Sequence, residues 1–139
     1  MSAIKKVMII DDDEINNFIC LKNIKDAQFA EDAQYYLRGQ EALDHLQIGI
    51  DEDPGLLPDI IFLDINMPKM NAWEFLERYN EMHPKFPRKV KLFILSSSVY
   101  RKDIDRSALY DVVTDYIIKP LSKEKLLRIK EKFFTSSLK

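Results

Sequence analysis

Four residues with side chains suited to binding metal or phosphate follow short apolar runs in this sequence. Asp11 and Asp12 follow the run KVMII, Asp64 follows DIIFL, and Lys119 follows DYII. Carboxylates held close together repel one another, and they remain ionised only beside a cation. Carboxylate oxygens are hard ligands that suit Mg²⁺, which usually keeps positions open for water and phosphate oxygens. If the fold brings these residues together, they form a site for a divalent cation and an anion.

A hydroxyl group extends this chemistry to phosphoryl groups. Ser96 follows the apolar run KLFIL and would supply a donor, while Lys119 would supply a second positive charge. An aspartate can itself be the nucleophile and form an aspartyl-phosphate. A metal ion and a lysine would neutralise charge on the transferring oxygens, where most of such catalysis resides. Asp64 is the predicted acceptor, because the mouth of a strand makes it reachable while the strand holds it rigidly.

The four apolar runs predict strands that would position these residues. Each run is short, continuous and closed by polar residues, which fits strands covered on both faces, as in a parallel sheet. A weaker strand is predicted over residues 29–36, in FAEDAQYY. The carboxyl ends of parallel strands meet at one edge of the sheet, where such folds bind ligands. Asp11, Asp12, Asp64, Ser96 and Lys119 are therefore expected to gather there.

Helical patterns alternate with the strands, and this alternation predicts a doubly wound parallel sheet with helices on both faces. Asn71 and Ser122 are the predicted N-caps of the third and the last helix. A shorter, more polar helix is expected in YRKDIDRSALYDVV, and a loop over residues 49–59. The apolar residues at helical spacing, expected to face inward, are Ile15, Phe18, Ile19, Ile24, Ala42, Leu43, Leu46, Trp73, Leu76, Tyr79, Leu126, Leu127, Ile129 and Phe133.

Length and composition favour a globular protein of one domain. The chain has 139 residues and a net charge of −2, which gives no support for a nucleic-acid binder. Cys20 is the only cysteine, so no intramolecular disulfide can form. No apolar run approaches the roughly 20 residues of a membrane helix, and the first residues make a poor signal peptide. We therefore expect one cytoplasmic domain over residues 1–139.

The motifs resemble those of the receiver domain of bacterial two-component response regulators. IIDDDE, LDINMP, FILSSS and YIIKPL carry the resemblance, in the family's order and at compatible spacing. It covers the chain from about Lys5 to Phe134. It implies the flavodoxin-like three-layer fold of the chemotaxis regulators: five helices and a five-stranded parallel sheet of order 2-1-3-4-5. Asn71-Ala72 stand where the family commonly has Asp-Gly, which leaves the expected chemistry untouched.

The resemblance also implies a ligand set for Mg²⁺, or for Mn²⁺ in its place. Asp12 is expected to bind the metal directly, and Asp11 to act partly through water. Asp64 would take the phosphoryl group and also bind the metal. Asn66 would offer its backbone carbonyl. Asp13 extends the acidic pair to a triplet, and it is assigned no metal role.

Further residues match the family's switch. Ser96 stands at the position of the Thr/Ser switch, and Tyr116 at that of an aromatic side chain that rotates inward with it. Lys119 would contact the phosphoryl oxygens, and its bond to Pro120 is usually cis in the family. Taken singly, these segments are also compatible with solvated loops, and Tyr116 with ordinary packing in the core or at the surface.

The function implied is a phosphorylation-controlled switch that is not an enzyme beyond accepting and releasing its own phosphoryl group. The donor would be a histidine kinase or a phosphotransfer protein. Because Lys139 follows soon after the last predicted helix, we expect the protein to signal by binding. The partner would be a downstream protein, a second copy in a phosphorylation-dependent homodimer, or a competing kinase for which the protein acts as a phosphate sink. No nucleic-acid or membrane partner is expected.

Two alternatives use the same residues differently. A Mg²⁺-dependent phosphatase or phosphotransferase of the haloacid-dehalogenase type also has an aspartate nucleophile. It carries a second Asp two residues later, where Asn66 stands here and cannot act as a general acid or base. The other alternative is a phosphate-independent binding module of the same fold, against which the intact acid pair, acceptor and lysine argue.

Overall fold

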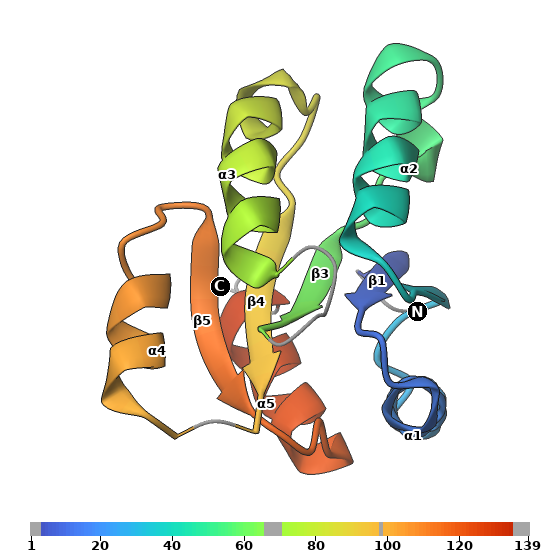
Figure 1. Ribbon diagram of the computed structural model, residues 1–139. Helices are drawn as coiled ribbons and strands as arrows, with labels where there is room; N and C mark the ends of the chain where they lie inside the picture. Colours follow the sequence, from blue (N-terminus) through green and yellow to red (C-terminus); the bar gives the residue numbers. More distant parts are fainter. Residues whose placement is uncertain (1–3, 66–70, 98, 135–139) are drawn as a thin grey trace.

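A five-stranded sheet between two layers of helices forms the protein (Figure 1). The computed structural model describes residues 4–65, 71–97 and 99–134. All neighbouring strands are parallel, in the order β2-β1-β3-β4-β5, which confirms the predicted fold. In the described residues the strands are β1 (Lys6–Ile10), β2 (Asp32–Tyr36), β3 (Ile60–Asp64), β4 (Lys91–Ser96) and β5 (Val113–Ile118). The helices are α1 (Glu14–Asp26), α2 (Gly39–Asp51), α3 (Ala72–Met82), α4 (Arg101–Ser107) and α5 (Lys123–Phe134).

The burial of each strand follows its place in the sheet. All residues of β3 are buried, because this strand lies at the centre and is covered on both faces. β2 lies at one edge, and its residues are exposed or partly buried. This position explains why DAQYY has the weakest apolar signal of the strands.

Each face of the sheet carries its own hydrophobic core, because successive side chains of a strand point to opposite faces. Ile61 and Leu63 of β3 pack with residues of α2 and α3. Ile60 and Phe62 pack on the other face with residues of α1 and α5. The helices therefore cover both faces, as the alternation of strands and helices predicts.

The helix α1 forms where it is predicted, but its expected inward face is wrong at three of the four positions. The buried residues of this helix are Asn17, Cys20 and Ile24. Asn17 fixes the rotation of the helix, because its buried amide donates a hydrogen bond of 2.9 Å to the carbonyl of Asp11. The apolar residues that this rotation leaves at the surface are Ile15 (74% exposed), Phe18 (67%) and Ile19 (46%).

The loop predicted over residues 49–59 is wrong for its first three residues, since α2 continues to Asp51. Gly49 is buried in this helix, and a Cβ placed there would lie 2.6 Å from Cδ2 of Leu57. The glycine therefore serves close packing of α2 against the returning chain. A short 3₁₀ helix, Pro54–Leu56, begins the return, with the Asp53 carboxylate accepting from the amide of Gly55.

Both predicted N-caps are confirmed. The Asn71 side chain accepts a hydrogen bond of 3.0 Å from the amide of Glu74, and the Ser122 hydroxyl accepts one of 3.2 Å from the amide of Lys125. In α5, however, Leu127 is 52% exposed, which contradicts its predicted inward position. Among the helices of the described ranges, none has the length and apolar character needed to cross a membrane.

Candidate functional site

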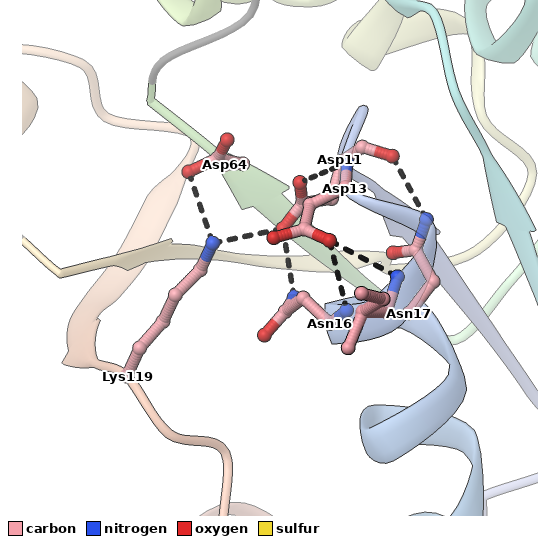
Figure 2. Close-up of polar contacts among 7 residues, drawn as sticks. Asp11, Asp13, Asn16, Asn17, Asp64 and Lys119 are labelled. Carbon is pink, nitrogen blue, oxygen red and sulfur yellow. Dashed lines mark hydrogen bonds and ion pairs between the residues drawn. The ribbon is translucent and has the colours of Figure 1, made fainter.

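Asp11, Asp64 and Lys119 meet at the carboxyl edge of the sheet (Figure 2). Asp11 directly follows β1, Asp64 is the last residue of β3, and Lys119 directly follows β5. The alternation of side chains explains the meeting, because each residue continues the series that faces α1 and α5. The residues two positions earlier pack in or against that core: Ile9, Phe62 and Ile117.

Lys119 lies between the two buried carboxylates. Its Nζ is 2.9 Å from Oδ2 of Asp11 and 3.5 Å from Oδ1 of Asp64. Burial by itself would lower the pKa of Lys119. The hydrogen bond to Asp11 and the charges of both carboxylates outweigh that effect, so the pKa of Lys119 is raised. The ammonium is thus held in its charged form between the two carboxylates.

Asp11 is held in place by several donors and is almost fully buried, with 1% of the residue exposed. Its Oδ1 accepts from the amide of Asp13 at 2.9 Å, and its Oδ2 accepts from Nδ2 of Asn16 at 2.8 Å (Figure 2). Its own amide donates to the carbonyl of Tyr36 at 3.0 Å, and its carbonyl accepts from Asn17. Both its main chain and its carboxylate therefore have defined orientations.

Asp12 completes an acidic cluster with Asp11 and Asp64. One carboxylate oxygen of each residue lies within 4.8 Å of the corresponding oxygens of the other two. Asp12 is exposed, whereas the other two are buried, so the cluster opens to solvent on the side of Asp12. Three ionised carboxylates and the ammonium of Lys119 would together carry two negative charges, which one divalent cation balances. The donor set is hard oxygen, so the residues present fit Mg²⁺.

Asn66, the predicted donor of a backbone carbonyl to the metal, lies outside the described residues. The Lys119–Pro120 peptide bond is cis, as the resemblance implies.

Ser96 ends β4 at the same carboxyl edge as Asp64, and both Ser96 and Tyr116 continue side-chain series that pack against α2 and α3. Ser96 is the buried last residue of β4, and its carbonyl accepts a hydrogen bond of 2.8 Å from the amide of Lys119. It continues the series of Ile94, which packs against α2 and α3. Tyr116 pairs with Ile94 in the sheet and packs, partly buried, against the same core. The two predicted switch residues therefore lie on one face of adjacent strands.

The polar residues that hold Asp11 in place were not predicted from the sequence. Asp13 is the N-cap of α1, and its carboxylate accepts from the amides of Ile15 and Asn16 at 3.0 and 3.2 Å. Asn16 and Asn17 then anchor the carboxylate and the carbonyl of Asp11. The available signal was the pair of asparagines in the first turns of a helix, where they are poor helix formers.

Comparison with known proteins agrees with this geometry. The family model of the response regulator receiver domain matches residues 7–130. A two-component response regulator from Cytophaga hutchinsonii is similar in structure, with a TM-score of 0.81 and 31% identity over 93% of this chain and 96% of that one. The phosphorylated cyanobacterial phytochrome response regulator RcpA gives a TM-score of 0.73 and 26% identity over 97% and 96% of the two chains.

One curated relative is much longer than this chain. Hybrid signal transduction histidine kinase L of Dictyostelium discoideum is 30% identical over 131 residues, which are 92% of this chain and 7% of that protein. The chain thus spans a small part of that relative. Receiver domains in general act as signalling switches rather than as enzymes, and they bind Mg²⁺ at an acidic pocket. From its family match, its sheet order and its acidic edge, this chain belongs to the response regulator receiver domains of two-component signalling.

Proposed function

We propose that Asp64 accepts a phosphoryl group from a phosphohistidine of a histidine kinase or a phosphotransfer protein. The observation that carries the proposal is the position of the Lys119 ammonium between Asp11 and Asp64, with Asp12 completing the acidic cluster. Similarity to a histidine kinase that contains such a unit, and to a regulator described as phosphorylated, supports the same assignment.

The reaction exchanges one bond to phosphorus for another. A carboxylate oxygen of Asp64 forms the new P–O bond while the P–N bond to the donor histidine breaks, and the histidine nitrogen keeps the electron pair and is protonated. Asp64 suits this role because the end of a central strand fixes it and only 6% of the residue is exposed. Lys119, already within 3.5 Å of Asp64, would stabilise charge on the phosphoryl oxygens.

Asp11, Asp12 and Asp64 would hold Mg²⁺, or Mn²⁺, at this edge. When bound, the ion would supply positive charge to the phosphoryl oxygens and lower the repulsion between the incoming group and the carboxylates. Asp11 has little exposed surface and three donors on its carboxylate, from Asp13, Asn16 and Lys119. This supports a partly water-mediated contact for Asp11 and a direct one for the exposed Asp12.

Phosphorylation would then act on the face of Ser96 and Tyr116. New charge on Asp64 would attract the Ser96 hydroxyl, and Tyr116 on the neighbouring strand would follow it inward. Such a local event changes a binding surface when it biases an element with more than one arrangement. We place the output on the surface of α4, β5 and α5, where it would bind a downstream protein or a second copy of the chain.

Labelling with a small phosphodonor tests the acceptor. The protein is incubated with acetyl phosphate and Mg²⁺, and intact mass spectrometry should show one added phosphoryl group that alkali removes. Asp64→Asn should not be labelled. Asp26→Asn is the matched control, because Asp26 is exposed at the far end of α1 and pairs with Lys22 outside the metal cluster; it should be labelled like the unchanged protein. Equal labelling of Asp64→Asn would reject Asp64 as the acceptor.

Size-exclusion chromatography of the same samples tests the output. A shift to dimer with phosphodonor, absent in Asp64→Asn, would support self-association as the output. Ser96→Ala should be labelled but should not shift. If labelling changes neither the oligomeric state nor the affinity for any partner protein identified, the phosphate-independent binding module becomes the better account of this fold.

A further inference from the structure

One carboxylate oxygen of Asp11 accepts hydrogen bonds from two side chains, the neutral amide of Asn16 and the ammonium of Lys119. Oδ2 of Asp11 accepts from Nδ2 of Asn16 at 2.8 Å and from Nζ of Lys119 at 2.9 Å. Oδ1 accepts from the amide of Asp13 at 2.9 Å. A carboxylate offers about four lone-pair positions, so these three donors leave about one for a metal or its water.

Asn16 is held rigidly enough to orient that oxygen. It is the third residue of α1, and its own amide donates at 3.2 Å to the Asp13 carboxylate that caps the helix. The next residue, Asn17, ties the same turn to the carbonyl of Asp11 at 2.9 Å. Hydrogen bonds at Asn16 and at the next residue therefore hold the backbone from which the Asn16 side chain reaches Asp11 (Figure 2).

The two donors to Oδ2 would respond differently to a cation. A divalent ion held by Asp11, Asp12 and Asp64 would repel the ammonium of Lys119, because both are positive. The amide of Asn16 has no net charge and can stay. Asn16 would thus keep its hydrogen bond to Oδ2 of Asp11 while Lys119 moves away from that oxygen.

We propose that Asn16 is a positioning residue that sets the affinity of the site for Mg²⁺ by sharing Asp11 with Lys119. The inference rests on the proposed function, because it requires the acidic cluster to bind the ion. Of these two side-chain donors to Oδ2 of Asp11, the loss of Asn16 would leave Lys119. A cation would then have to displace Lys119 with no amide left to donate a hydrogen bond to that oxygen. Hydrogen-bond partners of metal ligands typically change metal affinity by about 10- to 100-fold.

Titration of the unphosphorylated protein with Mg²⁺, followed by amide chemical shifts, tests this role without any phosphoryl transfer. Asn16→Ala should bind Mg²⁺ about tenfold more weakly. Asn16→Leu, which removes the donor and keeps the branched shape, should do the same. The matched control is Asn23→Ala on the same helix, because Asn23 donates at 3.1 Å to the carbonyl of Leu121 and not to a carboxylate of the site. It should bind Mg²⁺ like the unchanged protein.

A double-mutant cycle separates sharing with Lys119 from a general structural effect. In a Lys119→Met background, Asn16→Ala should weaken Mg²⁺ binding by less than about twofold, because no ammonium then competes for Oδ2. A loss of equal size in both backgrounds, or an equal loss in Asn23→Ala, would overturn the inference. If the unchanged protein shows no Mg²⁺ binding at all, the metal site of the proposed function fails as well, which is a distinct result.

Discussion

Lys119 and Asp11 form a 2.9 Å ion pair across 108 residues of the chain. The pair joins the ends of β1 and β5, which are separated in the sheet by β3 and β4. It places a positive charge beside the acceptor candidate Asp64 before any donor arrives. Because Asp11 is almost fully buried, the pair is shielded from the solvent screening that weakens surface ion pairs.

The ion pair of Lys119 predicts how stability changes at alkaline pH. The folded protein raises the pKa of Lys119 above the usual 10.5, since its contacts with Asp11 and Asp64 outweigh its burial. The stabilisation from its charge is therefore complete below the unfolded pKa and is lost as the pH rises through the folded pKa. In urea unfolding, the unchanged protein should exceed Lys119→Met in stability at neutral pH, and the gap should narrow above pH 10.5.

The control for this measurement is Lys22→Met, which removes an exposed ammonium outside the site and so reproduces the change in net charge. A gap between the unchanged protein and Lys119→Met that stays constant into the alkaline range would contradict the raised pKa.

Cys20 should react slowly with thiol reagents in the folded protein. Burial, and secondarily the negative charge of Asp11, raises the pKa of the thiol from 9.0 to about 11. The thiolate is the reactive form, so the raised pKa alone predicts a reaction about 100-fold slower at neutral pH. The rate of modification by a coloured disulfide reagent, with and without denaturing urea, measures this. Similar rates in the two conditions would show that the thiol is accessible and ionises normally.

The contact between Arg106 of α4 and Trp73 of α3 should stabilise the folded protein. The guanidinium carbon lies 4.4 Å from the centre of the indole ring, and Tyr110 stacks on the same ring with centroids 6.2 Å apart. Arg106→Ala should lower the free energy of unfolding by about 0.5–1 kcal/mol. In a Trp73→Leu background, Arg106→Ala should lower the free energy of unfolding by clearly less, because the ring it contacts is absent.

Arg101→Ala serves as the control for that cycle. Arg101 is on the same helix and forms an exposed ion pair of 3.2 Å with Asp105. Its loss should cost no more than about 0.5 kcal/mol, equally in both backgrounds. Equal costs of Arg106→Ala with and without Trp73 would mean that the ring is not its partner in solution.

The close approach of Gly49 to Leu57 predicts that the effect of Gly49→Ala on stability depends on the size of residue 57. In Gly49→Ala the new methyl would meet the buried Leu57 at 2.6 Å. Overpacking of this kind costs about 1–3 kcal/mol, which exceeds the gain of about 1 kcal/mol from better helix propensity. Thermal and urea unfolding should show net destabilisation. In a Leu57→Ala background, where space is available, Gly49→Ala should stabilise instead; destabilisation there would place the cause elsewhere.

Much of the fold could be predicted because the local signals agreed with the global arrangement. Continuous apolar runs such as IIFL are found in strands covered on both faces, and Asn71 and Ser122 begin helices through hydrogen bonds within four residues. The edge strand β2 was harder to place, because exposure on the free edge permits polar residues. The rotation of α1 was predicted wrongly, because its apolar residues Ile15 and Phe18 face outward.

The sequence by itself determined the residue types of the site and the strand ends that carry them. Parallel strands must bring their carboxyl ends to one edge, so Asp11, Asp64 and Lys119 follow from local pattern and strand direction alone. Only the tertiary structure decided which polar side chains hold Asp11. The hydrophobic pattern of the sequence does not tell which asparagine will contact Asp11. The buried position of Asn17 and the contact of Asn16 depend on how α1 is rotated against the loop after β1. That rotation is fixed by hydrogen bonds whose geometry exists only after the sheet and the helix have come together.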